Sequence, residues 1–204
     1  MLKKLATAKI VPIVTIYEEK EALNLAKALI DGGATALEVT LRSPFGLNAI
    51  KQIKKEFPKT LVAAGTVTNI KEFEAALKVG ADFIITPGFS EKFAQQIAPF
   101  KAAVLPGVAT ASDIMSAAEC GYYTLKFYHA VLCGGVEAIK AYSKPFSHIK
   151  FVPTGGINAS NAREFLSHPN VVALGSSSWV NPKELVLDKN YERITLLTKK
   201  AFEI

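Results

Sequence analysis

A lysine lies in the middle of a short stretch that otherwise has the composition of a strand. Residues 123–128 read Tyr-Thr-Leu-Lys-Phe-Tyr, and such aromatic and β-branched runs favour a strand. Side chains alternate between the two faces of a strand, so Lys126 is expected opposite Leu125 and Phe127. Burying an unpaired ammonium group is costly. Two interpretations stay open: a lysine at a solvent-facing edge, or an amine held in a partly dry site, neutral often enough to attack a carbonyl.

A carboxylate and a guanidinium occur in a second strand-like stretch. Residues 36–42 read Ala-Leu-Glu-Val-Thr-Leu-Arg, and alternation puts Glu38, Thr40 and Arg42 on one face. A Glu–Arg pair that only fills the interior is the alternative, although desolvation makes such pairs doubtful stabilisers. With Lys126 the inward set has two cations and one carboxylate, which favours a functional cluster.

Two small-residue segments are candidates for anion binding. One is Thr154-Gly155-Gly156, and the other is Ser176-Ser177-Ser178. Glycine lets backbone N–H groups converge, and a following helix N-terminus adds a favourable dipole. Ordinary Gly/Ser turns are the alternative. Thr66, after the small residues 63–65, offers a hydroxyl group near the same place.

These residues need a scaffold, and the order of elements indicates one. Short apolar runs alternate with amphipathic stretches. Strands are predicted at 10–16, 35–40, 60–65, 82–86, 102–106, 123–128, 149–154 and 171–175. Helices are predicted at 18–30, 48–57, 69–79, 91–98, 111–120, 135–142, 160–166 and 190–202.

Eight alternating pairs predict a (β/α)8 TIM barrel, an α/β fold, as a single domain over residues 1–204 with a short N-terminal segment before the first strand. An open doubly wound sheet is the competitor, and the lack of Gly-x-Gly-x-x-Gly after the first strand counts against it. In such a barrel the active site lies at the C-terminal ends of the strands, and the loops after the seventh and eighth strands commonly bind phosphate.

Composition narrows the class of partner. The net charge of +6 comes from scattered lysines, so no nucleic-acid partner is expected, whereas a small anionic substrate would suit. No apolar run is long enough to span a bilayer, which predicts no membrane partner and a cytoplasmic protein. Cys120 and Cys133 are expected to be free thiols, and the three histidines form no metal-spaced pair, so neither a metal nor a cofactor is predicted.

Five motifs in this order resemble one family. They are Glu38-Val39-Thr40-Leu41-Arg42, Gly65-Thr66-Val67, Leu125-Lys126-Phe127, Gly134-Gly135-Val136 and Pro153-Thr154-Gly155-Gly156-Ile157. The chain resembles, over nearly its full length, the bacterial 2-keto-3-deoxy-6-phosphogluconate aldolases, also known as 4-hydroxy-2-oxoglutarate aldolases. The resemblance implies a metal-independent, trimeric Schiff-base lyase that releases pyruvate and glyceraldehyde 3-phosphate.

The resemblance also implies roles for individual residues. Lys126 matches the Schiff-base lysine and Glu38 the proton-transferring carboxylate. Arg42 and Thr66 match residues that hold the pyruvate carboxylate. The residues that match the phosphate and specificity end are Thr154, Gly155, Gly156, Ser177 and Ser178.

Two departures from the family pattern concern this end. Tyr128-His129 stands where an aromatic residue and proline are usual, and Gly175-Ser176-Ser177-Ser178 stands where a glycine pair before the serine is expected. Alternatives also stay open: the galactonate epimer as substrate, a phosphosugar epimerase or isomerase on the same barrel, and a non-catalytic phosphometabolite-binding regulator. Trapping with pyruvate and borohydride separates the aldolase from the epimerase or isomerase, and the three charged inward residues argue against the regulator.

Overall fold

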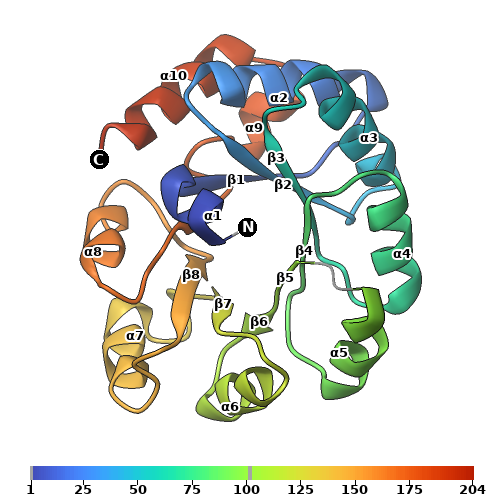
Figure 1. Cartoon of the computed structure of the whole chain (residues 1–204). Coiled ribbons are helices and arrows are strands. Elements are labelled where there is room, and N and C mark those ends of the chain that lie inside the picture. The colour runs from blue at the N-terminus through green and yellow to red at the C-terminus, as the bar shows by residue number, and fades with distance from the viewer. Residues whose placement is uncertain (1, 101–102) are drawn as a thin grey trace.

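The computed structural model describes residues 2–100 and 103–204, and it shows parallel strands arranged in a ring inside a layer of helices (Figure 1). The strands are β1 (Ile10–Val14), β2 (Ala36–Thr40), β3 (Leu61–Gly65), β4 (Phe83–Ile85), β5 (Val104–Leu105), β6 (Gly107–Val108), β7 (Thr124–Tyr128), β8 (Lys150–Thr154) and β9 (Leu174–Ser176). The helices are α1 (Leu2–Ala8), α2 (Ala22–Asp31), α3 (Gly46–Glu56), α4 (Ile70–Lys78), α5 (Glu91–Ile97), α6 (Ala111–Glu119), α7 (Gly135–Ser143), α8 (Ala162–Ser167), α9 (Lys183–Leu187) and α10 (Tyr191–Phe202), with 3₁₀ turns at Glu19–Glu21 and Ala98–Phe100. The predicted (β/α)8 barrel is confirmed.

The barrel closes at Pro106. The strand order is β5-β4-β3-β2-β1-β9-β8-β7-β6, so the two ends of the order are consecutive in the chain. The single fifth strand predicted at residues 102–106 is wrong, because it divides at Pro106 into β5, which pairs with β4, and β6, which pairs with β7. Proline has no N–H to donate to a ladder, while its carbonyl still accepts from the N–H of Lys126 at 2.8 Å. Ala102, the first residue of that prediction, lies outside the described residues.

Other predicted boundaries also shift. The last strand was expected at 171–175 but runs Leu174–Ser176, and Val171 makes only an isolated bridge to Phe151. Helices α1 and α9 were not predicted. Their 7 and 5 residues are too few for helical periodicity to stand out in the sequence.

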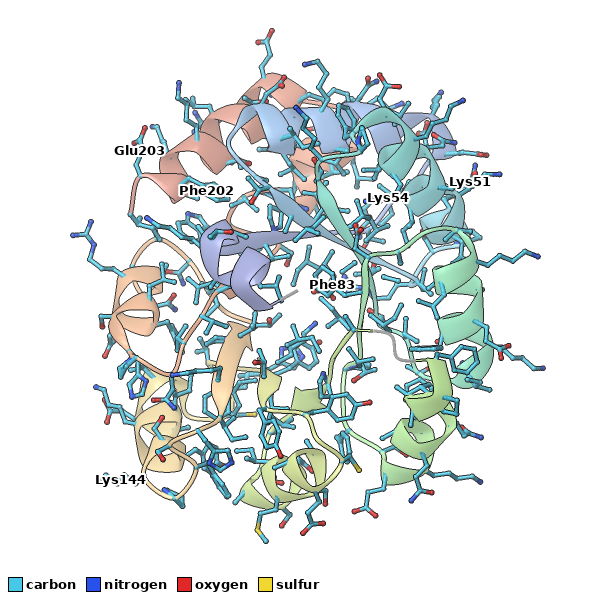
Figure 2. The ribbon with its side chains drawn as sticks, viewed as in Figure 1. Lys51, Lys54, Phe83, Lys144, Phe202 and Glu203 are labelled. Carbon is cyan, nitrogen blue, oxygen red and sulfur yellow. The ribbon has the colours of Figure 1, made fainter. Side chains whose placement is uncertain are left out.

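Helix α1 covers one end of the barrel interior. Leu5 and Ala8 are fully buried and pack with Val11, Phe83 and Val152 from inside the ring of strands. Figure 2 shows the side chain of Phe83 near the middle of the ring, whereas Lys51 and Lys144 extend from the outer helices. The polar residues predicted for the site lie at the end of the barrel opposite α1.

The outward faces of the strands carry the apolar residues predicted for them. Leu37 and Val39 of β2 pack against α2 and α3, and Leu125 and Phe127 of β7 belong to a second buried cluster with residues of α6, α7 and α8. All four side chains are fully buried. Alternation along β2 and β7 therefore turns Glu38 and Lys126 toward the barrel axis.

A capping box begins α6. The Thr110 hydroxyl accepts from the Asp113 N–H, while the Asp113 carboxylate accepts from the N–H groups of Ala109 and Thr110 at 3.0 and 2.9 Å. Partial burial raises the pKa of Asp113, but these hydrogen bonds outweigh burial and hold the pKa below its usual value of 3.8. The ionised carboxylate is thus favoured by folding.

We expect Asp113→Ala to lower the free energy of unfolding by about 0.5–1.5 kcal/mol at neutral pH, because hydrogen bonds to its carboxylate are lost. Because the folded pKa is depressed, this contribution is present above the pKa of the unfolded state and is lost as pH falls through the folded value. Urea unfolding of both proteins at neutral pH and near about pH 3 measures the difference. A difference that stays constant over this range would contradict the assigned hydrogen bonds.

Candidate active site

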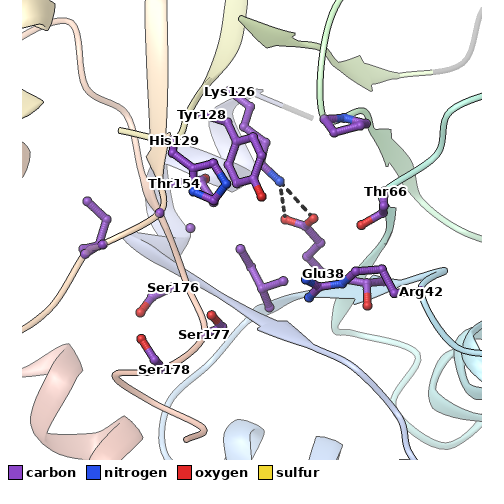
Figure 3. Close-up of a pocket in the computed structure, with 17 residues that line it drawn as sticks. Glu38, Arg42, Thr66, Lys126, Tyr128, His129, Thr154, Ser176, Ser177 and Ser178 are labelled. Carbon is purple, nitrogen blue, oxygen red and sulfur yellow. Dashed lines mark hydrogen bonds and ion pairs between the residues drawn. The ribbon is translucent and has the colours of Figure 1, made fainter. Parts of the chain in front are cut away.

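Lys126 and Glu38 form a buried pair inside the barrel. Lys126 Nζ lies 3.1 Å from Glu38 Oε1 and 3.5 Å from Oε2, and the two residues are 6 % and 2 % exposed. They come from strands on opposite sides of the ring, and Figure 3 shows the lysine amine meeting the carboxylate across the barrel. The prediction that Lys126 faces the interior rather than solvent is confirmed.

A glycine and an aromatic ring shape the space around this pair. A Cβ atom at Gly65 would lie 2.2 Å from Glu38 Oε1 and 2.6 Å from its Cγ, so only glycine leaves room for the carboxylate at this end of β3. The Tyr128 ring lies on the other side, with its centroid 5.1 Å from Lys126 Nζ. A cation at this distance from an aromatic ring is attracted by the ring quadrupole.

Arg42 and Thr66 lie at the rim of the same cavity. Arg42 follows the end of β2, and its Nη2 donates to Thr15 Oγ1 at 3.1 Å, while Thr15 shares a 2.9 Å hydrogen bond with Thr40. Thr66 adopts a φ of 61°, a left-handed conformation that is costly for a β-branched residue and recurs at functional sites. Both side chains keep polar groups at the cavity mouth.

The opposite rim, here called the glycine–serine end, consists of residues 154–156 and 176–178. Gly155 and Gly156 have φ of 101° and 77°, which glycine adopts freely. The Gly156 carbonyl accepts from the side-chain amides of Asn158 and Asn161 at 3.3 and 3.0 Å, which anchors the loop.

Donor groups at the glycine–serine end remain available for a ligand. Within the described residues, the N–H groups of Gly156, Ser177 and Ser178 donate to no protein acceptor, and the buried Ser176 hydroxyl has no partner. Buried polar groups normally have a partner. Together these donors could hold an anion.

One cavity of about 270 Å³ brings all of these groups together. Every residue predicted for the site lines it: Lys126, Glu38, Arg42, Thr66, Thr154, Gly155, Gly156, Ser177 and Ser178. Tyr128 and His129 line it as well and had not been assigned to the site. Ser176, which the sequence offered only as part of the serine segment, also lines it. Tyr128 shares the inward face with Lys126, so alternation could have identified it. The positions of Ser176 and His129 depend on where β9 and β7 end.

Within residues 2–100 and 103–204, no three His, Cys, Asp or Glu side chains gather where they could hold a metal ion. Over the same ranges, no helix combines the length and apolar character needed to cross a membrane.

The fold and the cavity define a (β/α)8 protein with a buried lysine–carboxylate pair at its centre, N–H and hydroxyl donors without a protein partner at one rim and an arginine at the other. A family model described as "Aldolase: KDPG and KHG aldolase" matches residues 1–197. A protein of Pseudomonas aeruginosa named 2-dehydro-3-deoxy-phosphogluconate aldolase is 41 % identical over 196 residues, which cover 96 % of this chain and 89 % of that protein. The KHG/KDPG aldolase of Escherichia coli is 37 % identical over 199 residues, covering 98 % and 93 %.

A solved structure agrees with these sequence relatives. The KDPG aldolase of Legionella pneumophila, with pyruvate captured as a covalent carbinolamine intermediate, has a TM-score of 0.93 and 37 % identity, and the match covers 98 % of this chain and 96 % of that one. The chain belongs to the KDPG and KHG aldolase family. The resemblance identified from the sequence is thereby confirmed.

Proposed function

We propose that this protein is a Schiff-base aldolase that cleaves 2-keto-3-deoxy-6-phosphogluconate to pyruvate and glyceraldehyde 3-phosphate, and that also accepts 4-hydroxy-2-oxoglutarate. The observation that carries the proposal is the buried Lys126 amine, 3.1 Å from the Glu38 carboxylate. The Legionella relative, captured with a pyruvate carbinolamine, supports the same chemistry.

Lys126 is the proposed nucleophile. Its amine adds to the C2 ketone of the substrate to give a carbinolamine, and loss of water leaves a protonated imine. The imine accepts the electron pair of the breaking C3–C4 bond and becomes an enamine, which divides one difficult step into easier ones. Protonation of the enamine at C3 and hydrolysis of the imine then release pyruvate and restore the lysine.

Glu38 is the proposed proton carrier. Its oxygens lie within hydrogen-bond reach of Lys126 Nζ, so the carboxylate can take the proton that the amine gives up on attacking the ketone. It then supplies a proton to the departing carbinolamine hydroxyl, takes one from the C4 hydroxyl as the C3–C4 bond breaks, and delivers one to the enamine carbon. One carboxylate serves each step because the reacting atoms all lie next to the lysine.

Arg42 and Thr66 are proposed to hold the substrate carboxylate. A guanidinium binds a carboxylate as a two-pronged fork, which fixes the ketone for attack by Lys126. The hydrogen bond from Arg42 to Thr15 positions the guanidinium at the rim. At the opposite rim, the donors of the glycine–serine end are proposed to bind the phosphate.

We expect Arg42→Gln to raise the KM for pyruvate in methyl-proton exchange roughly tenfold to a hundredfold, because a charged hydrogen bond is replaced by a weaker neutral one. Exchange of pyruvate protons in deuterated water, followed by NMR, measures the constant. Arg163→Gln is the matched control, since Arg163 is exposed on α8. An unchanged KM in Arg42→Gln would remove Arg42 from carboxylate binding.

The direct test of the proposed function is turnover by the wild-type chain. Pyruvate release is followed for the phosphogluconate substrate, its galactonate epimer and 4-hydroxy-2-oxoglutarate, and the expected preference is for the phosphogluconate substrate. A protein that releases pyruvate from none of the three would refute the proposal. Higher turnover of the galactonate epimer would reassign the substrate while keeping the mechanism.

The assembly and setting belong to the same proposal. We propose a homotrimer in the cytoplasm, in line with the family resemblance. Val131 and Leu132, which follow the catalytic strand, are 43 % and 84 % exposed, and an assembly of chains would cover such apolar side chains. The expected solution mass is that of three 22.0 kDa chains.

A further inference from the structure

His129 lines the cavity but has no part in the chemistry proposed above. It follows the last residue of β7, three positions after Lys126, and it is exposed. Its imidazole stacks on the Tyr128 ring, with centroids 3.7 Å apart and an interplanar angle of 30°. Neither ring nitrogen makes a hydrogen bond to any residue in the described ranges, so both remain available to a ligand.

The backbone on the far side of His129 fixes the ring against the glycine–serine end. The N–H of Ala130 donates to the Thr154 carbonyl at 2.8 Å, and the N–H of Val131 donates to the Gly155 carbonyl at 3.1 Å. A Cβ atom at Gly155 would lie 2.7 Å from His129 Nδ1 and 3.3 Å from its Cα. The imidazole therefore packs directly on the first glycine of that loop, and Figure 3 shows it on the side of the cavity nearest Thr154.

Charge is distributed unevenly around the cavity. Glu38, Arg42 and Lys126 occupy the side where the keto acid reacts, and Arg42 and Lys126 are committed there to the carboxylate and the imine. The glycine–serine end offers hydroxyl and N–H groups but no fixed positive charge. A phosphate monoester carries close to two negative charges at neutral pH. Of the described residues that line the cavity, His129 is the one at that end that can become a cation.

Lys183 is the other cation to consider. It lines a neighbouring cavity together with Ser177 and Ser178. Its Nζ lies 5.6 Å from the centroid of the Tyr17 ring, on the side of the neighbouring cavity. The other titratable groups that line the cavity are Tyr128, on whose ring His129 stacks, and Lys126, Glu38 and Arg42 on the side where the keto acid reacts.

We propose that His129, in its imidazolium form, binds the phosphate of the substrate and thereby sets a preference for phosphorylated over unphosphorylated keto acids. This inference rests on the proposed aldolase function. A charged hydrogen bond from the imidazolium joins the neutral N–H and hydroxyl donors of the glycine–serine end.

The test compares His129→Phe and His129→Gln with the wild-type protein. Phenylalanine keeps the stack on Tyr128 and removes both nitrogens, while glutamine keeps a hydrogen-bond donor without the charge. For the phosphogluconate substrate at about pH 6, we expect KM to rise roughly tenfold or more in His129→Phe and less in His129→Gln, with kcat changed little. Pyruvate is too short to reach the glycine–serine end, so its exchange KM should change far less than the KM for the phosphorylated substrate.

The pH profile separates this role from a structural one. Titration of the substrate phosphate affects all variants equally, so the ratio of variant to wild-type KM reports on the imidazole alone. We expect that ratio to fall as pH rises, because only the protonated imidazole donates a charged hydrogen bond. His148→Asn is the matched control, because His148 is exposed and makes an edge-to-face contact with Tyr123 outside the cavity, and it should leave KM unchanged.

Each outcome decides the proposal. A KM ratio that is independent of pH, or equal losses for pyruvate and the phosphorylated substrate, would overturn it. So would a Lys183→Gln variant that alone carries the loss, because the phosphate would then be held from the neighbouring cavity. If the wild-type protein turned over none of the keto acids, the aldolase function itself would be refuted. If the wild-type protein were active and His129→Phe had the same KM, only the role of His129 would be refuted.

Discussion

Lys126→Ala is expected to abolish turnover, with kcat falling by more than about 10⁴-fold, because the covalent route disappears with its nucleophile. Any turnover that remains in Lys126→Ala would come only from binding and orienting the substrate in the cavity. Pyruvate release from the phosphogluconate substrate measures the loss. Lys51→Ala is the control, since Lys51 is an exposed lysine of α3 that extends away from the barrel (Figure 2).

A second substitution separates loss of the nucleophile from loss of the fold. Lys126→Ala leaves Glu38 buried without its partner, and an uncompensated buried charge is strongly destabilising. Lys126→Arg keeps a cation beside Glu38 but offers no amine that can form an imine. We expect this variant to be folded and equally inactive. If Lys126→Arg retained substantial turnover, Lys126 would act electrostatically, as in the epimerase or isomerase alternative.

Glu38→Gln is expected to slow proton transfer while the imine still forms. Glutamine fills the same space beside Gly65 but cannot exchange a proton, and a positioned acid–base group contributes about 10²–10⁴-fold in rate. Exchange of the pyruvate methyl protons should slow by a factor in this range. Borohydride should still trap pyruvate on the variant, which shows that Lys126 is in place. Exchange at the wild-type rate would show that another group carries the proton.

The interior of the barrel was predictable because alternation is a local property of a strand. One glutamate in a run of branched apolar residues, and one lysine in an aromatic run, each break the pattern at a position whose direction is known. Leu37, Val39 and Phe127 face the helices as expected. The pairing of Lys126 with Glu38 then follows from closing the strands into a ring.

The structural features that the sequence did not predict depend on interactions between segments that are far apart in the chain. The break at Pro106 arises where β4 and β7 must be bridged by one segment, and composition alone does not show which strand closes the ring. Helix α1 is stabilised by the apolar interior that it covers rather than by its own length. Whether Ser176 and His129 line the cavity depends on where β9 and β7 end, and strand ends shift with pairing to their neighbours.

The site of covalent labelling in the wild-type protein tests directly whether Lys126 is the amine that forms the imine. Pyruvate and borohydride are added together, and the digested protein is analysed by mass spectrometry. We expect one reduced pyruvate adduct, on the peptide that contains Lys126, and none when borohydride is added without pyruvate. An adduct on another lysine, or an unlabelled Lys126 in protein that is turning over substrate, would contradict this expectation.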